Sequence, residues 1–130
     1  MVSQVYAVCL LDGKVVLVTY PDDRSNLPGG TVEPGESYIQ TLEREVQEET
    51  NMLLLDFKPI GYQVVKEEDG KEHIQLRYVA WVQKLADFEQ DPGGRVTGNK
   101  QVNLDDLNKE VRYGEIGERI ILRAKEVMKI

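Results

Sequence analysis

The sequence predicts an α/β domain in which two helices surround a mixed β-sheet. Three observations support this expectation. Apolar and polar residues alternate along several segments, as they do in half-buried strands. Two other segments repeat their apolar residues about every 3.6 positions, which is the period of a helix. The chain has 130 residues and 41% hydrophobic content, enough for one packed core and too little for two, so residues 1–130 are expected to form a single domain.

The first elements are expected to be a β-hairpin, a polar loop and a glycine turn. Val2–Leu11 and Lys14–Tyr20 are predicted strands, because Asp12-Gly13 between them is a strong hairpin signal. Pro21–Asn26 is rich in polar and turn-forming residues and is therefore expected to be a loop. It leads into the turn Leu27-Pro28-Gly29-Gly30.

A helix is predicted from Glu36 to about Thr50. With ~100° of rotation per residue, three carboxylates project from this helix within one narrow stripe. They belong to Glu45, Glu48 and Glu49. Arg44 borders the stripe and can pair with a carboxylate through two hydrogen bonds. An apolar stripe beside the acidic one comprises Ile39, Leu42, Val46 and Leu53.

The second half is expected to contain two paired strands, a long loop, a short extended piece and an amphipathic helix. The strands are joined by the turn Glu68-Asp69-Gly70-Lys71, and Gly61 is a candidate bulge in the first of them. The apolar face of the helix carries Ile116, Ile120, Ala124 and Val127. In chain order the predicted elements are Leu53–Lys66, His73–Leu85, Ala86–Lys100, Gln101–Leu104 and Glu115–Lys129.

The grouping of three carboxylates needs a physical explanation. Two unit charges ~4 Å apart repel by roughly 4 kcal/mol at an effective dielectric constant of ~20. A hard cation such as Mg²⁺ removes this repulsion, because it takes oxygen ligands. The alternative is a solvated acidic helix face, where like-charged neighbours cost only ~0.2–0.5 kcal/mol each. The glycine turn and Glu36 at fixed distances upstream favour the metal site.

The spacing of these residues carries a family resemblance. From Gly30 the chain has five residues, Glu36, seven further residues, and then Arg44-Glu45-Val46-Gln47-Glu48-Glu49-Thr50-Asn51-Met52. This pattern resembles the Nudix box, the signature of the MutT-related Nudix hydrolases, which act on nucleoside diphosphates linked to another group. One position departs from the family pattern, because Asn51 stands where the family has Gly. Asn is the non-glycine residue that best tolerates a left-handed helix end, at a cost of a few tenths to ~1 kcal/mol.

The resemblance implies a three-layer α/β/α sandwich and a pyrophosphohydrolase that uses Mg²⁺, with Mn²⁺ as a substitute. It also implies roles for the residues of the box. Glu45, Glu48 and Glu49 are the expected metal ligands, and Glu48, Glu49 and Arg44 the expected catalytic residues. Glu36 is expected to pin the loop before the helix, and the backbone at Gly29 and Gly30 to approach the metal or phosphate closely.

Three further residues are weaker candidates. Many relatives supply a general base from the loop before the last helix, but the matching region here holds Arg95 and Lys100. Glu89, several residues earlier, is the candidate base, against the alternative of a solvated loop residue. If Glu89 does not reach the metal, Glu48 or Glu49 must activate the water. Arg24 is a candidate phosphate ligand, against the alternative of an ordinary surface arginine. Phe88 is a candidate for stacking on a base, against the alternative of anchoring its loop to the core.

The expected substrate is a small nucleotide, with a modified nucleoside triphosphate favoured. A nucleotide-sugar or dinucleotide pyrophosphatase is the alternative among enzymes. A nucleotide-sensing module without catalytic activity is the alternative from another class, and it predicts damaged carboxylates, whereas here all of them are intact.

Composition restricts the partners and the location. A formal net charge of −7 argues against a protein that coats the phosphates of nucleic acid. No apolar run approaches the ~20 residues that span a bilayer, and Met1–Leu11 lacks the basic leader of a secretory signal, so a cytoplasmic protein is expected. The lone Cys9 excludes an internal disulfide. A monomer and a homodimer both remain open.

Overall fold

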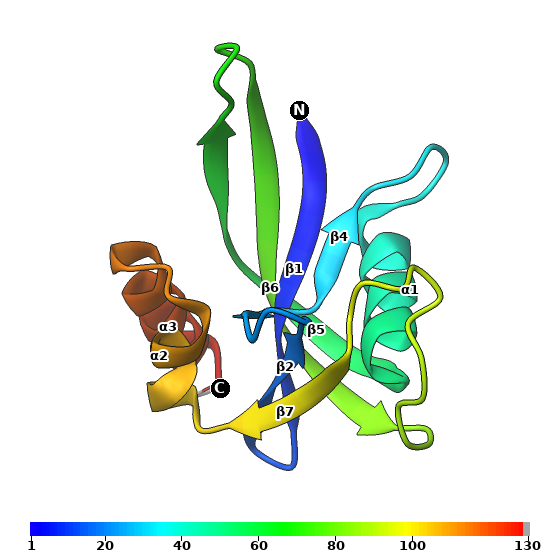
Figure 1. The fold of residues 1–130 in the computed structure, drawn as a ribbon. Helices are drawn as coiled ribbons and strands as arrows, with labels where there is room; N and C mark the ends of the chain where they lie inside the picture. The colour runs from blue at the N-terminus through cyan, green and yellow to red at the C-terminus, as the bar shows by residue number, and fades with distance from the viewer. Residues whose placement is uncertain (129–130) are drawn as a thin grey trace.

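The computed structural model describes residues 1–128, and these form a sheet with helices on both of its faces (Figure 1). The sheet contains seven strands. The elements in chain order are β1 Val2–Leu11, β2 Lys14–Thr19, β3 Ser25–Asn26, β4 Gly29–Thr31, α1 Tyr38–Thr50, β5 Met52–Lys66, β6 Glu72–Lys84, β7 Gly98–Val102, the 3-10 turn η1 Leu104–Asp106, α2 Leu107–Val111 and α3 Glu115–Met128.

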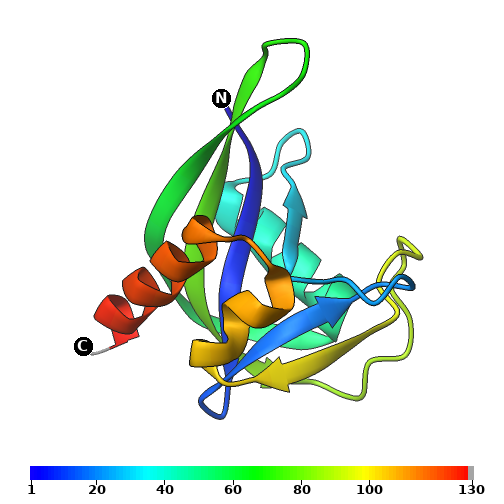
Figure 2. The same cartoon turned by 60° about the vertical axis from the view of Figure 1, so that its left-hand side comes forward.

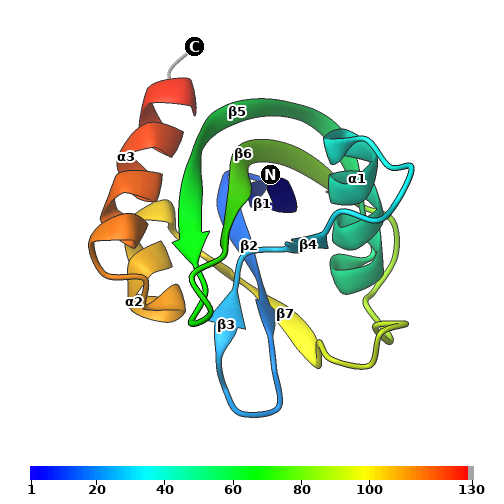
Figure 3. The ribbon, with the colours of Figure 1, turned by 90° about the horizontal axis from the view of Figure 1, so that it is seen from above.

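The sheet is mixed, as predicted. Its main strand order is β3-β2-β1-β6-β5, with β4 paired to β1 and β7 paired to β2. β1 and β6 run parallel, and the other strand pairs are antiparallel. Seen from above, the long strands β5 and β6 curve between α1 and α3 (Figure 3). β1 therefore lies centrally and contacts β2, β4 and β6.

Successive side chains of β1 point to opposite faces of the sheet, and they pack into two separate halves of the core. Val5, Ala7 and Cys9 point to one face and pack with Leu42 and Val46 of α1. Val8 and Leu10 point to the other face, where the packing partners come from α2 and α3, namely Leu107, Val111, Ile120, Ile121 and Ala124. The predicted α/β/α sandwich is thus confirmed, with α1 on one side of the sheet and α3 on the other (Figure 2).

Several predicted elements are confirmed with small shifts. Asp12 and Gly13 both have positive φ, 50° and 82°, as a tight hairpin turn requires. The pairing of β5 with β6 shifts register between Pro59 and Gly61, which confirms the bulge. The first helix begins at Tyr38 and not at Glu36, because Ser37 and Gln40 form a capping box in front of it.

Other expectations were wrong or incomplete. Leu53 does not belong to the apolar stripe of α1; it lies in β5 and is 43% exposed. Strand β7 begins at Gly98, inside the segment predicted as a loop, because its polar residues pair with β2. Strands β3 and β4 and helix α2 were not predicted, since each is too short to show a period. The last predicted residue of the final helix, Lys129, lies outside the described residues.

Asn51 ends α1 in the left-handed conformation that the sequence predicts, with φ 56° and ψ 41°. Its backbone N–H donates to the carbonyl oxygen of Gln47 at 2.9 Å. Its side-chain Nδ2 also donates to the carbonyl oxygen of Asp87 at 3.2 Å. The residue therefore ends the helix and anchors the loop that follows β6.

None of the helices in residues 1–128 combines the length and the apolarity that a bilayer span needs.

Substitution of Asn51 tests this helix end. Asn51→Ala is expected to lower the free energy of unfolding by about 1–2 kcal/mol, because alanine is strained in the left-handed region and loses the bond to Asp87. Asn51→Gly is expected to stay within about 1 kcal/mol of the wild type. Glycine adopts the left-handed conformation without strain, and this gain offsets the loss of the side-chain hydrogen bond. Urea unfolding followed by circular dichroism measures both variants. Equal stability of the alanine variant and the wild type contradicts this account.

Candidate functional site

The glycine turn is held against the C-terminal half of α1. Gly29 has φ 153°, and a Cβ at this position would collide with the carbonyl oxygen of Val5 and with Tyr6. The backbone N–H of Gly29 donates to Glu49 Oε1 at 2.9 Å. A residue with a side chain cannot occupy this position without moving β1 or β4, so the contact between turn and helix depends on glycine.

Gly30 permits a second close approach. A Cβ on Gly30 would collide with Oε2 of Glu45, and it would lie 2.7 Å from Glu45 Cδ. The absent side chain thus leaves the space that the Glu45 carboxylate occupies. Together the two glycines let β4 lie directly beside the acidic stripe of α1.

Arg44 connects the carboxylates around the turn. Its Nε and Nη2 donate to the two oxygens of Glu36 at 2.8 and 3.0 Å. Its Nη1 donates to Glu45 Oε1 at 2.5 Å and lies 3.5 Å from Glu48 Oε2. Nη2 also donates to the carbonyl oxygen of Thr31 at 3.2 Å, which joins the helix to β4. This planar, multidentate pairing fixes the rotamers of the acidic side chains.

Glu36 accepts more hydrogen bonds than those from Arg44. Its Oε1 accepts from the Thr41 hydroxyl at 2.9 Å and from the backbone N–H of Glu33 at 3.1 Å. The Arg44 guanidinium and these donors lower the pKa of Glu36 to about 2. Glu36 therefore stays ionised and ties the loop at residues 33–36 to α1.

Glu49 is the most buried of the three carboxylates, with 9% of its surface exposed. Burial raises its pKa to about 8, and the charges of Glu45, Asp91 and Glu48 add to the increase. The bond from Gly29 opposes this shift but does not cancel it. Burial also raises the pKa of Glu45. The site therefore holds more negative charge than its own hydrogen bonds compensate.

A cavity of about 400 Å³ opens beside these carboxylates. It brings together several residues that the sequence predicts for the site, and it includes Arg24, whose Nε donates to Asp22 Oδ2 at 2.6 Å. The predicted residues that line it are Arg24, Gly29, Gly30, Glu45, Glu48 and Glu49.

Phe88 and Glu89 lie elsewhere. They line a neighbouring cavity of about 520 Å³, together with Arg44 and Glu48. Glu89 is exposed, and Phe88 is half-buried. Glu48 borders both cavities, so Glu89 and the carboxylate stripe are neighbours without sharing the main cavity.

Sequence reasoning missed Asp91, which is 5% exposed and lines the main cavity. Its carboxylate accepts from the backbone N–H groups of Gly93, Arg95 and Val96 at 3.0, 3.2 and 3.1 Å. These bonds fold the loop so that Arg95 also lines the cavity. The turn signature Asp91-Pro92-Gly93-Gly94 is the signal that would have identified it. Tyr6 and Tyr20 line the same cavity and were missed as well.

The donor set fits a hard divalent cation, although the ligands do not converge on one point. Within residues 1–128, no three acidic, histidine or cysteine side chains are arranged around a common metal position. The reason is visible in the contacts: Arg44 holds Oε1 of Glu45, and Gly29 holds Oε1 of Glu49. The raised pKa of the buried Glu49, with the charges of Glu45, Asp91 and Glu48 beside it, nevertheless marks a place where positive charge is needed.

Comparison with known proteins places this chain in a family. A family model described as NUDIX domain matches residues 2–123. The protein YtkD of Bacillus subtilis (strain 168), named "Putative 8-oxo-dGTP diphosphatase", is 35% identical over 97 residues. The matched part covers 70% of this chain and 59% of that protein, so the chain spans less than two thirds of the relative's length.

Solved structures share the fold. The Bacillus subtilis pyrophosphohydrolase BsRppH has a TM-score of 0.77 at 24% identity, over 96% of this chain and 82% of that chain. The MutT protein of Methanosarcina mazei Go1 has a TM-score of 0.73 at 21% identity, over 95% and 92% of the two chains. These structures confirm the fold, and the family model confirms the resemblance predicted from the sequence pattern.

The raised pKa of Glu49 predicts a pH dependence of stability in EDTA. The folded protein retains a proton that the unfolded chain releases, so the free energy of unfolding falls as pH rises from about 4.5 towards 8. One proton sets an upper limit of about 1.4 kcal/mol per pH unit. Urea unfolding from pH 5 to pH 8 is expected to show a smaller decline for Glu49→Gln than for the wild type. The exposed Glu43→Gln variant should keep the wild-type slope, and identical slopes in all three proteins contradict the prediction.

Proposed function

The chain belongs to the NUDIX domain family, and from this premise we propose that it is a metal-dependent pyrophosphohydrolase that cleaves the diphosphate linkage of a small nucleotide. One observation carries the proposal. The carboxylates of Glu45, Glu48 and Glu49 line a single cavity against a glycine turn, and all three are intact. A solvated acidic helix face has neither a buried glutamate nor a backbone donor aimed at it.

Mg²⁺, or Mn²⁺ in its place, would be held by Glu45, Glu48 and Glu49, and when bound it would neutralise phosphate charge and lower the pKa of a water molecule. The protein's own contribution is positioning. Arg44 fixes the direction of Glu45 through the contact at 2.5 Å and ties it to Glu36. Gly29 fixes Glu49 through its backbone N–H.

The phosphates of the substrate are proposed to lie in the cavity beside β4. Arg24 and Arg95 line this cavity and offer guanidinium donors to phosphate oxygens. The backbone of Gly29 and Gly30 allows a close approach, because no Cβ intervenes. Asp91 has a positioning role: it holds the loop that presents Arg95.

Glu48 is proposed as the general base. Its side chain is 35% exposed and borders both cavities, so it can accept a proton from a water molecule beside the substrate. Glu89 lies in the neighbouring cavity and is exposed, which argues against a direct role. Both oxygens of Asp91 are engaged by backbone N–H groups, which suits an anchor better than a base.

A modified nucleoside triphosphate is the proposed substrate class, supported by the 35% identity to YtkD. A nucleotide-sugar or dinucleotide remains the alternative substrate, and the assay below separates the two. A sensor without activity is the third reading, and the intact carboxylates count against it.

The proposal predicts nucleotide hydrolysis that depends on Mg²⁺ or Mn²⁺ and on Glu48. Glu48→Gln is expected to lower kcat/KM by about 100-fold or more, because it removes a charged group that acts at the reacting centre. The effect is measured with a panel of modified and ordinary nucleoside triphosphates, nucleotide-sugars and dinucleotides. Release of phosphate and pyrophosphate is the readout. Glu43→Gln, an exposed substitution on the same helix, is the matched control and should retain activity. Nucleotide binding without hydrolysis of any compound would favour the sensor.

A further inference from the structure

Arg24 reaches the main cavity, beside the carboxylates of α1, from a tight turn between β2 and β3. The backbone N–H of Tyr20 donates to the carbonyl oxygen of Arg24 at 3.0 Å, and the N–H of Asp23 donates to the carbonyl oxygen of Tyr20 at 3.1 Å. Asp23 has φ 66°, in the left-handed region that aspartate tolerates. The turn is therefore closed by its own backbone, and the side chain of Arg24 starts from a defined place on the cavity wall.

Asp22 holds Arg24 with both of its carboxylate oxygens. Oδ1 accepts from the backbone N–H of Arg24 at 3.2 Å, and Oδ2 accepts from its Nε–H at 2.6 Å. These hydrogen bonds lower the pKa of Asp22, so its carboxylate stays ionised. The guanidinium carbon lies 5.5 Å from the centre of the Tyr20 ring, within the range of a cation–π contact. Asp22 thus fixes one edge of the guanidinium, and Tyr20 lies against one face.

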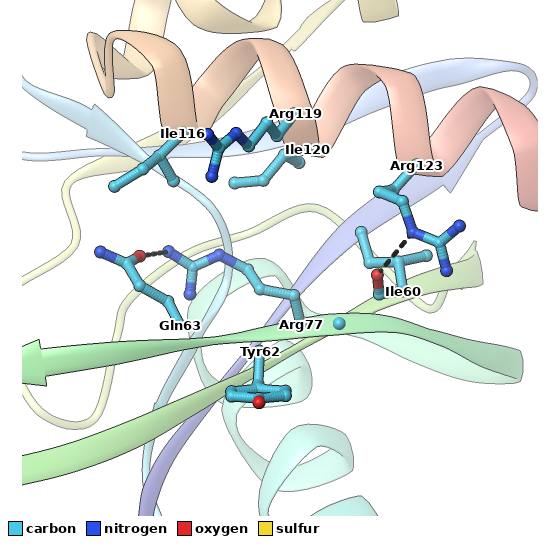
Figure 4. Close-up of a pocket in the computed structure, with 9 residues that line it drawn as sticks. Ile60, Tyr62, Gln63, Arg77, Ile116, Arg119, Ile120 and Arg123 are labelled. Carbon is cyan, nitrogen blue, oxygen red and sulfur yellow. Dashed lines mark hydrogen bonds between the residues drawn. The ribbon is translucent and has the colours of Figure 1, made fainter.

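The terminal nitrogens of Arg24 keep their donors. Among residues 1–128, the hydrogen bonds of this guanidinium are made by Nε alone. Arg77 is held in the opposite way, because its terminal nitrogens donate to Gln75 and Gln63 at 3.0 and 2.9 Å; the bond to Gln63 is visible in Figure 4. Arg77 therefore serves protein oxygens, whereas both terminal nitrogens of Arg24 can serve a ligand.

Arg24 stands between two cavities. It lines the main cavity and also a cavity of about 420 Å³ beside the end of α2. Asp22, Asp23 and Glu110 line that second cavity as well. The side chain of Arg24 is 74% exposed, so without a tether it can turn towards the other carboxylates. The bond at Nε holds it at the border of the main cavity.

We propose that Asp22 is a positioning residue, which holds Arg24 against Tyr20 so that the terminal nitrogens of Arg24 meet a phosphate of the substrate. The inference rests on the proposed function, in which Arg24 is a phosphate ligand. The planar donors of a guanidinium match phosphate oxygens. An arginine that is already fixed loses less conformational entropy when the phosphate binds. Asp22 itself does not touch the substrate, because both of its oxygens are engaged by Arg24.

Neutralisation of Asp22 separates positioning from simple charge. Removing a negative charge near a phosphate site tightens binding if charge alone matters, because like charges repel. Positioning predicts the opposite result. Asp22→Asn is the suitable variant, since asparagine has one acceptor oxygen where aspartate uses two. It can keep the bond to the backbone N–H of Arg24 and thus the turn, but it then faces Nε with an amide donor.

Binding of inorganic pyrophosphate with Mg²⁺, followed by titration calorimetry, measures the effect without turnover. Asp22→Asn is expected to raise the dissociation constant about threefold, a modest change because the ion pair is exposed. Asp23→Asn is the matched control: it removes the same charge from the next residue, whose side chain has no ion pair with Arg24 in the described part of the chain. Its dissociation constant should equal that of the wild type or lie below it.

A double-mutant cycle assigns the effect to Arg24. Arg24→Gln is expected to weaken pyrophosphate binding about tenfold, and Asp22→Asn should cause no further loss in the Arg24→Gln background. The proposal is overturned if wild-type protein does not bind pyrophosphate, if Asp22→Asn binds as well as wild type or better, or if its loss persists without Arg24. An equal loss in Asp23→Asn also overturns it. Failure to hydrolyse any nucleotide, with the cycle as expected, would count against the proposed function alone.

Discussion

The site depends on the repulsion between carboxylates that the fold holds close together. Glu45, Glu48 and Glu49 project from successive turns of α1, and Asp91 adds a further charge from the loop before β7. Arg44 and the N–H of Gly29 compensate part of this charge. Burial, and after it the charges of Glu45, Asp91 and Glu48, still raises the pKa of Glu49. The fold tolerates the imbalance because the rest of α1 is anchored by Leu42 and Val46 in the core. A divalent cation is the chemical species that completes such an arrangement.

The central strand β1 lies between this acidic site and the buried Arg77 of β6. Its odd-numbered residues Val5, Ala7 and Cys9 pack towards α1, which positions the carboxylates. On its other face, Tyr6 lies over Arg77, and the row of pairing continues to Gly29. The acidic site thus lies at one end of this row and the buried Arg77 at the other.

Local patterns in the sequence were sufficient to predict part of this arrangement. The hairpin at Asp12-Gly13, the acidic stripe of α1 and the left-handed Asn51 each depend on neighbouring residues, and all three were predictable. Strands β4 and β7 were not predictable from local patterns. The glycine turn of β4 becomes a strand only because β1 pairs with it, and the polar segment of β7 only because β2 pairs with it. Arg77 and Asp91 were missed for a similar reason: their environments come from residues distant in the sequence. Arg44 was predictable as a partner of a carboxylate, but its simultaneous contacts with Glu36, Glu45 and Thr31 required the fold.

Crystals soaked in Mn²⁺ test the central claim most directly, because anomalous scattering locates this ion. The account predicts an ion in the cavity beside Gly30, contacted by oxygens of Glu45, Glu48 and Glu49, with the Glu45 carboxylate turned at least partly away from Arg44. An ion bound elsewhere, or a cavity without one while Glu45 and Glu49 keep their present contacts, would contradict it.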